Sequence, residues 1–351
     1  MRLESQVHAR RRRGRDGQGG TALKSIQIVC PVFREEEVIL SFHERLREAV
    51  IPLRARYTVS FLYVMDPSPD LTESILQQLA AADPEVEVMV MSRRFGHQAA
   101  LIAGIDACRA DAIVMLDSDG QHPPELIPSL VERWEGGAQI VQTLRKDGNE
   151  TGLLKRTSSA MFYRLLSRIG SIELRGGAAD YRLLDRKVID VLRDELKERN
   201  VFLRGLVAWM GFNITFVEFE PLRRLHGASK YRPSILFNFA LQGVSSFSKT
   251  PLRMCTMAGL LLSVLSVIAG VLMVIAYFLG NTAMPGWASL IAFISLLGGM
   301  QLFFMGIIGE YLGQVFDEVK GRPRYLVAKR YGSGAANIPI NAVPGRVSSN
   351  D

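Results

Sequence analysis

Two carboxylates and an amide lie close together in the segment Asp117-Ser118-Asp119-Gly120-Gln121. The segment directly follows the charge-free run Ala112–Leu116, which has the composition of a buried parallel strand. Such a strand would deliver the acidic side chains to its carboxyl end, where open α/β sheets bind ligands. Carboxylate and amide oxygens suit Mg²⁺ or Mn²⁺ bridging a diphosphate. Taken alone, these residues are at least as typical of a turn that caps the next helix.

Acidic residues also follow two other predicted strands. The first continues as Pro31-Val32-Phe33-Arg34-Glu35, and the second as Met65-Asp66-Pro67-Ser68-Pro69-Asp70. Carboxylates at one sheet edge repel one another unless a cation or a hydrogen-bonding ligand lies between them. The repeated pattern therefore favours a ligand site over unrelated helix caps, although Asp70 is as typical of an N-cap for the helix after it.

Short apolar runs alternate with helical patterns over the first part of the chain. We expect strands at Ile26–Cys30, Phe61–Val64, Val86–Met91, Ala112–Leu116 and Ala138–Gln142. We expect helices at Glu36–Val50, Leu71–Ala82, Gln98–Arg109, Pro124–Trp134 and around Lys155–Ile169, then a less regular segment to about Pro221. This alternation predicts an α/β fold with a doubly wound, mostly parallel sheet that binds ligands at its carboxyl edge.

The 351-residue chain contains no Asp, Glu, Lys or Arg between Arg253 and Glu310, although 22% of all residues are charged. Within that window Met254–Leu279 and Trp287–Gly309 each reach the roughly 20 residues that a membrane-spanning helix needs. They predict a transmembrane hairpin. The alternative, a pair of buried core helices, would ordinarily have a polar face. No ionisable group lies inside either span, which argues against ion transport.

The net charge of +7 has the distribution typical of a membrane protein rather than of a nucleic-acid-binding protein. Basic residues form the run Arg10–Arg13 and flank the hairpin at Arg253, and more of them follow it. These are Lys320, Arg322, Arg324, Lys329 and Arg330. The positive-inside rule places both termini and the large soluble part in the cytoplasm, at the cell membrane. Three isolated cysteines and the lack of a visible signal peptide fit a reducing compartment.

Several motifs, in this order, resemble the inverting glycosyltransferases of family 2. They are Pro31-Val32-Phe33-x-Glu35, Asp66 with Ser68 and Asp70, Arg93-x-Phe95-Gly96-His97 and Asp117-x-Asp119-Gly120-Gln121. Later motifs resemble one subgroup, the polyprenyl-phosphate glycosyltransferases of the bactoprenol glucosyltransferase and dolichol-phosphate mannose synthase type. They are Ala179 to Arg186, Arg224 to Tyr231, Ser246-Phe247-Ser248, Gly309 to Gly313, and Arg322-Pro323-x-Tyr325. The resemblance covers about residues 24 to 330 and implies a GT-A catalytic domain.

The resemblance implies roles for the matching residues. Those lining the nucleotide pocket would be Pro31, Phe33, Glu35, Asp66, Asp117 and Ser118. Asp119 and Gln121 would ligate Mg²⁺ or Mn²⁺, with Asp117 near the ribose and the diphosphate. Phosphate groups of the donor or the acceptor would face Arg145, Arg224 and Lys230, and the lipid phosphate would also meet Arg156 and Ser159. Asp180 would orient the acceptor or a basic residue; equally, it is a structural partner for Arg182 or Arg186.

The implied reaction transfers one hexose, with inversion, from a sugar nucleotide to a polyprenyl phosphate, and UDP-glucose is the favoured donor. The acceptor phosphate has a second pKa near 6, so it is largely ionised and needs no strong general base. One alternative is a GDP-mannose-dependent mannosyltransferase, and another is a non-catalytic sugar-nucleotide-binding membrane subunit. A processive polysaccharide synthase would need more spans and a Gln-x-x-Arg-Trp motif.

Two motifs depart from the family pattern. Met65-Asp66-Pro67-Ser68 replaces the usual Asp-Asp-Gly-Ser, and Arg94 replaces a common Asn. Pro67 and Pro69 lack backbone donors, which leaves the recognised base open. We expect His97 to pack or hydrogen-bond within its loop and His122 to occupy a structural helix-entry position.

The motifs and the charge pattern divide the chain into six expected segments. They are a disordered basic N-terminus (1–22), a cytoplasmic catalytic domain (23–232), an interfacial amphipathic helix (233–252), the transmembrane hairpin (253–310), a juxtamembrane segment (311–332) and a flexible tail (333–351). Small residues in the second span are typical of helix packing in membranes, so we expect them to contact another subunit in a homo-oligomer. They are Gly298, Gly299, Gly306 and Gly309.

Overall fold

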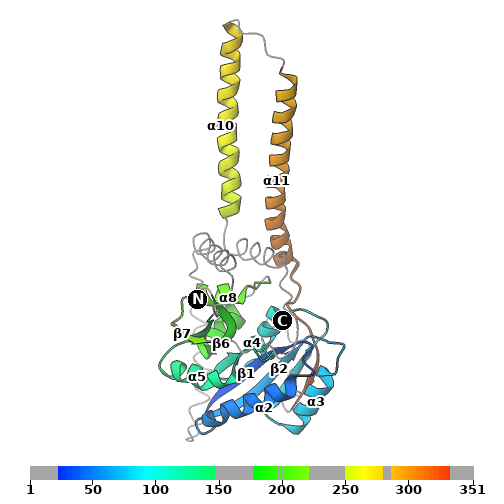
Figure 1. Cartoon of the computed structure of the whole chain (residues 1–351), viewed down its shortest axis with the longest axis vertical. Coiled ribbons are helices and arrows are strands. Elements are labelled where there is room, and N and C mark those ends of the chain that lie inside the picture. Colours follow the sequence, from blue (N-terminus) through cyan, green and yellow to red (C-terminus); the bar gives the residue numbers. More distant parts are fainter. Residues whose placement is uncertain are drawn as a thin grey trace, which may run out of the picture.

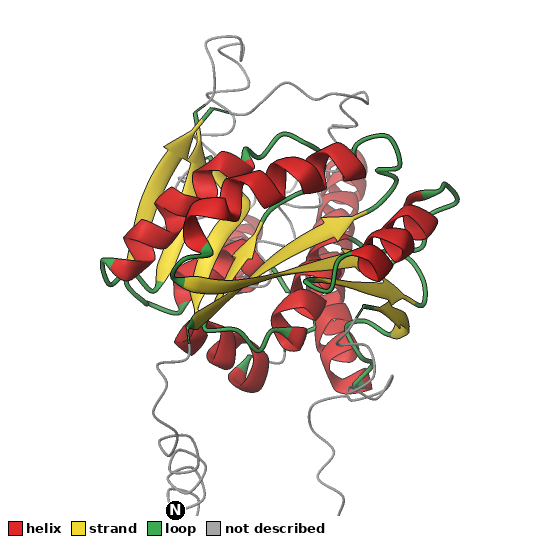
Figure 2. Cartoon of the chain, turned by 90° about the horizontal axis from the view of Figure 1, so that it is seen from below, coloured by secondary structure: helices red, strands yellow, loops and turns green. Residues whose placement is uncertain are grey.

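The computed structural model describes residues 23–146, 177–196, 198–199, 201–220, 250–279 and 286–332. These residues form an eight-stranded sheet with helices on both faces, and a helical hairpin that projects away from this α/β unit (Figures 1 and 2). The α/β architecture and the apolar hairpin were both expected from the sequence.

The strands lie in the order β7-β5-β6-β4-β1-β2-β3-β8. Their bounds are β1 Lys24–Val32, β2 Tyr57–Met65, β3 Val86–Met91, β4 Ala112–Met115, β5 Ile140–Arg145, β6 Ala178–Asp185, β7 Ile214–Phe219 and β8 Val327–Tyr331. Strands β1 to β4 pair in parallel, so their carboxyl ends share one edge. Strand β6 lies antiparallel between β4 and β5, and Arg182 lies opposite Met115. The start of β6 is therefore brought to that same edge.

Two apolar cores lie on the two faces of the sheet. Alternate residues of β1 face opposite cores: Ile28 and Cys30 belong to one, and Val29 to the other. The first core includes α2 (Ile39–Val50), α3 (Thr72–Ala82) and α5 (Ile127–Glu135), and the second includes α4 (His97–Ala107), α7 (Arg186–Asp190) and α8 (Leu203–Trp209). Helix α4 approaches β1 closely at Gly104, where an added Cβ would lie only 2.3 Å from Val29 Cγ1.

The five expected strands and four expected helices of the first part are present, with shifted ends, and Pro124–Trp134 divides into a 3₁₀ turn (Pro124–Leu126) and α5. The expected irregular segment before Pro221 is wrong in part. It contains β6, α7, a π-helical turn at Val191–Glu195, α8 and β7. Strand β6 escaped prediction because it buries Asp180 and Arg182, which interrupt the usual apolar pattern of a central strand. The expected helix around 155–169 lies outside the described residues.

The hairpin consists of α10 (Thr250–Phe278) and α11 (Trp287–Lys320). Both are long and apolar enough to cross a membrane, and only 6% of Leu252–Ala269 and none of Leu296–Lys320 is buried. The alternative of buried core helices is therefore wrong. The 34 residues of α11 extend about 50 Å, beyond the roughly 30 Å of a bilayer core. The helix continues past Glu310 into the expected juxtamembrane segment, and it ends at Gly321, whose φ is +67°.

Residues 311–332, expected as a juxtamembrane segment, also contribute a strand to the sheet. After α11 the chain returns to the α/β unit, where β8 pairs antiparallel with the edge strand β3. The last residues assigned to the interfacial helix, 250–252, belong to α10. The remainder of that segment lies outside the described residues.

Candidate active site

A cleft of about 260 Å³ lies at the carboxyl edge of β1 to β4. Its walls come from the segments that follow these strands and from the start of α4. The lining residues are Pro31, Val32, Phe33, Glu35, Asp66, Arg94, Gly96, His97, Ala100, Asp117, Ser118 and Asp119. The structure thus brings the predicted nucleotide-pocket residues together, although they are separated along the chain.

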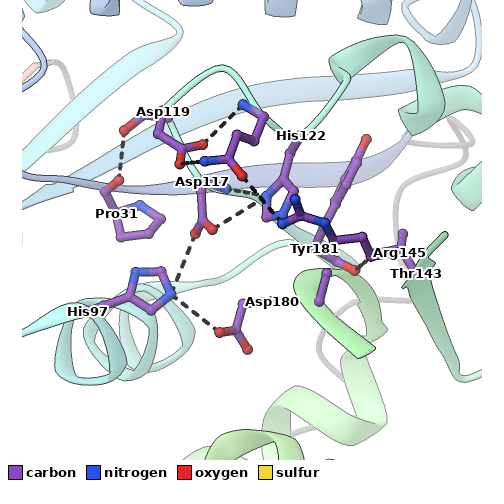
Figure 3. Close-up of polar contacts among 12 residues, drawn as sticks. Pro31, His97, Asp117, Asp119, His122, Thr143, Arg145, Asp180 and Tyr181 are labelled. Atoms are coloured by element: carbon purple, nitrogen blue, oxygen red, sulfur yellow. Dashed lines mark hydrogen bonds and ion pairs between the residues drawn. The ribbon is translucent and has the colours of Figure 1, made fainter. Parts of the chain in front are cut away.

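Internal hydrogen bonds hold the acidic turn after β4 in place (Figure 3). The Asp117 backbone N–H donates to His122 Nδ1 at 3.0 Å, and the buried Ser118 hydroxyl donates to the Pro31 carbonyl at 2.9 Å. Gly120 has a φ of +76°, which favours glycine in the turn. The 3₁₀ turn that follows has no side-chain cap. Asp117 and Asp119 therefore do not cap the next helix, and that alternative is wrong. His122 has the expected structural role.

Asp119 lines the cleft, and Gln121 is its hydrogen-bonded neighbour. The Gln121 amide nitrogen donates to Asp119 Oδ2 at 2.9 Å, and its backbone N–H donates to Asp119 Oδ1 at 3.1 Å. Arg145 Nη1 lies 3.4 Å from Gln121 Oε1 and donates to it, so the predicted phosphate-facing arginine joins this pair. Within the described ranges no group of three or more His, Cys, Asp or Glu side chains could hold a metal ion. A cation here would take hard oxygens from Asp119 and Gln121 and its remaining ligands from phosphate and water, which suits Mg²⁺.

Asp180 is buried at the start of β6 and is surrounded by cationic and amide groups. Its Oδ1 accepts from Arg182 Nη2 at 2.6 Å, and Arg204 of α8 donates to both carboxylate oxygens at 3.0 and 2.8 Å. Burial alone would raise the pKa of Asp180, but His97, Arg204 and Arg182 hold it well below its ordinary value. Burial lowers the pKa of Arg182 to about 10. Asp180 is therefore an ionised anchor, and the pairing with Arg182 that the sequence left open is present.

His97 links the two carboxylate regions. Figure 3 shows its ring between Asp117 and Asp180, and its Nε2 lies 3.5 Å from Asp117 Oδ1 and 3.5 Å from Asp180 Oδ2. Burial alone would lower the pKa of His97, but the hydrogen bond to Asp180 and the negative charge of Asp117 raise it. The expectation that His97 serves only its own loop is wrong. The motif Arg93-x-Phe95-Gly96-His97 marked His97 but not its carboxylate partners, and Arg204 had no local sequence signal, because these partners are far away in the chain.

Asp66, at the end of β2 in the cleft, is 4% exposed and accepts hydrogen bonds from the backbone N–H groups of Phe95 (3.0 Å) and Gly96 (2.8 Å). It fixes the loop that carries Arg94. The Arg94 guanidinium carbon lies 4.1 Å from the centre of the Phe33 ring, within cation–π range. The departure from the family pattern at position 94 therefore forms part of the cleft wall.

The other departures lie away from the cleft, since Pro67 and Pro69 are exposed and neither lines it. Asp70 lies just before α3 and accepts from the hydroxyls of Ser68 and Thr72. All three cysteines are free thiols, as expected. Four predicted phosphate-binding residues lie outside the described residues: Arg156, Ser159, Arg224 and Lys230.

Comparison with known proteins places this geometry in a family. Residues 27–193 match glycosyl transferase family 2, and residues 250–315 match the GtrB C-terminal hairpin. The SfII prophage-derived bactoprenol glucosyl transferase of Shigella flexneri is 38% identical over 306 residues, covering 87% of this chain and 98% of that protein. The uncharacterized glycosyltransferase YkcC of Bacillus subtilis is 39% identical over 305 residues, covering 87% and 94%.

A more distant likeness is to a solved structure of glucosyl-3-phosphoglycerate synthase from Mycobacterium tuberculosis. It has a TM-score of 0.43 and 20% identity, and covers 63% of this chain and 76% of that one. The family assignment rests on the closer relatives, which extend through both the α/β unit and the hairpin. The chain is a membrane-associated glycosyltransferase with a GT-A-like fold and belongs to glycosyl transferase family 2.

Proposed function

We propose that this enzyme transfers one hexose from a sugar nucleotide to a polyprenyl phosphate, with inversion at the anomeric carbon. UDP-glucose is the first donor to test. The relatives named bactoprenol glucosyl transferases support this choice, because they align over nearly their whole length, hairpin included.

One structural observation supports the proposal: the chain that leaves the hairpin joins the sheet at the same edge that carries the cleft. The segment that leaves α11 enters the sheet at the carboxyl end of β3, where Val327 pairs with Met91. From Lys320 to Val327 an extended chain covers at most about 25 Å. The edge with the cleft therefore lies within reach of the helix that leaves the membrane, which suits an acceptor whose phosphate stays at the headgroup level.

The side chains divide the work between donor and acceptor. Phe33, Glu35 and the loop fixed by Asp66 would contact the nucleoside, and Asp117 the ribose and the diphosphate. Arg145, together with Arg224 and Lys230, would face phosphate oxygens, and Arg156 and Ser159 would face the acceptor. Asp180 is poorly suited to accept a proton, because its pKa is held well below its ordinary value. An already ionised acceptor phosphate makes a strong base unnecessary.

Asp119 and Gln121 would hold the divalent cation, Mg²⁺ or Mn²⁺. When bound, such an ion supplies positive charge that stabilises a departing nucleoside diphosphate. Arg145, beside Gln121, would add a second positive charge at the same place.

The orientation belongs to the same proposal. Basic residues flank the hairpin at Arg253 and after α11, so we expect both termini and the α/β unit on the cytoplasmic side of the cell membrane. A homo-oligomer is expected to use the glycines of α11.

A donor screen tests the proposed function. Purified enzyme in lipid nanodiscs is incubated with undecaprenyl phosphate and UDP-glucose, UDP-galactose, UDP-GlcNAc or GDP-mannose, and lipid products are identified by mass spectrometry. We expect a hexosyl-phosphate lipid with UDP-glucose that disappears in EDTA. A product with GDP-mannose alone would favour the mannosyltransferase alternative. Donor binding without transfer or hydrolysis would favour the non-catalytic subunit.

A further inference from the structure

The chain that follows the membrane hairpin, residues 321–332, is called the return segment below. It extends the sheet at β3, and the pairing reaches Ser92, whose backbone N–H donates to the Leu326 carbonyl at 2.8 Å. Ser92 directly precedes the loop that carries Arg94 and Gly96 into the cleft wall. The return segment lines no part of the cleft, yet it holds the strand from which one wall departs.

Tyr325 connects the same segment to helix α4. Its hydroxyl donates to Asp106 Oδ2 at 3.0 Å. Burial raises the pKa of both groups, which keeps the phenol protonated as the donor. Tyr325 is partly buried and packs against the core that contains α4. The contact is therefore a part-buried hydrogen bond rather than a surface ion pair.

Helix α4 makes this contact relevant to the cleft. His97 is its first residue and Ala100 lies one turn further on, and both line the cleft. Asp106 lies near the other end, about 14 Å along the same helix axis. Because α4 is a continuous helix pressed against β1 at Gly104, tilting its far end moves His97 relative to Asp117 and Asp180.

A second tyrosine of the return segment provides a natural comparison. The Tyr331 hydroxyl donates to Glu73 Oε1 at 2.9 Å, and Lys329 also pairs with Glu73. Glu73 lies on α3, which contributes no residue to the cleft. The two tyrosines thus make the same kind of bond to a carboxylate, but only Tyr325 reaches a helix that forms the cleft wall.

We propose that Tyr325 is a positioning residue for glycosyl transfer: through Asp106 it sets the position of α4 and of the cleft wall that begins at Arg94. This inference gives a role to the Arg322-Pro323-x-Tyr325 motif and rests on the proposed function. It also makes the segment after the hairpin part of the structure that shapes the active site.

The test compares Tyr325→Phe with Tyr331→Phe in the full-length enzyme in nanodiscs. Each change removes one hydroxyl, so we expect similar, small decreases in Tm. We expect kcat to fall about tenfold in Tyr325→Phe, because small misplacements of reacting groups are costly, and to stay within about twofold in Tyr331→Phe. Equal kcat values in the two variants would overturn the inference.

Partner variants and a binding measurement complete the test. Asp106→Asn retains an acceptor for the Tyr325 hydroxyl and should keep most activity. Asp106→Ala should match Tyr325→Phe, and their combination should cost no more than either change alone; additive losses would contradict a shared bond. If the wild type transfers no hexose to undecaprenyl phosphate, the proposed function fails. Calorimetric UDP and GDP affinities then test the positioning role, with weaker binding expected in Tyr325→Phe only.

Discussion

Two kinds of carboxylate lie at one cleft. Those of the acidic turn after β4 are partly exposed, whereas Asp66 and Asp180, on either side of the turn, are buried. Asp66 and Asp180 are each 4% exposed, and backbone amides or arginines surround their oxygens. The Asp117 side chain is 31% exposed, and Asp119 is also partly accessible. Carboxylates at the same sheet edge thus differ in their surroundings: the buried ones are held by protein donors, and the accessible ones are open to a ligand.

The largest effect is expected from Asp180→Ala, which leaves Arg182 buried without its counter-ion. Breaking a buried ion pair on one side costs about 3–5 kcal/mol, so we expect Tm to fall by about 10 °C. Thermal unfolding followed by circular dichroism measures this. Adding Arg182→Met removes the unpaired charge and should restore much of the loss. An unchanged Tm in Asp180→Ala would show that Asp180 is not an internal anchor.

In contrast to Asp180→Ala, we expect Asp119→Ala to lower activity and leave thermal stability nearly unchanged. Loss of a group that stabilises the leaving diphosphate is expected to lower kcat about 100-fold to 1000-fold, with Tm within about 2 °C of the wild type. Glu125→Ala is the control, since Glu125 is an exposed acid paired with Arg45. Full activity of Asp119→Ala, or activity that is insensitive to EDTA, would refute the metal assignment.

Asp66→Asn tests whether Asp66, like Asp180, mainly holds the protein structure in place rather than contacting the proposed nucleotide. Hydrogen bonds to a charged group contribute about 1.5–3 kcal/mol, so losing part of this set should lower Tm by a few degrees and weaken nucleotide binding about tenfold. Calorimetric titration with UDP and a parallel melting curve give both numbers. Weaker binding with an unchanged Tm would instead place Asp66 with the ligand-facing carboxylates.

The smallest effect is expected from His97→Gln, and it should depend on pH. The folded protein raises the pKa of His97, so the imidazolium adds stability below the unfolded pKa of about 6.5. That contribution disappears as the pH rises through the raised value. The side chain is 39% exposed, so screening keeps the difference below about 1 kcal/mol. A Tm difference between wild type and variant that grows with pH would contradict this assignment.

Patterns within short stretches of sequence predicted the elements whose structure depends on neighbouring residues in the chain. The apolar runs of β1 to β4 marked the sheet, and the acidic turn at Asp117 marked its ligand edge. Strand β6 could not be recognised from its own sequence, because it buries the charged residues Asp180 and Arg182. The side chains that stabilise Asp180 include Arg204 and His97, which lie on other elements. Strand β8 was missed because it is short and carries the adjacent charged residues Lys329 and Arg330, and charged side chains are common at a sheet edge.

The position of β8 also has a consequence for biosynthesis. Strand β3 ends at Met91, but its edge partner leaves the ribosome only after both α10 and α11. Until then β3 presents unpaired backbone groups, and an open apolar edge invites pairing with another chain. Synthesis of the hairpin therefore precedes completion of the sheet. A fragment that stops before α10 would keep the cleft's sequence motifs but leave that edge exposed, and aggregation during its expression is the expected result.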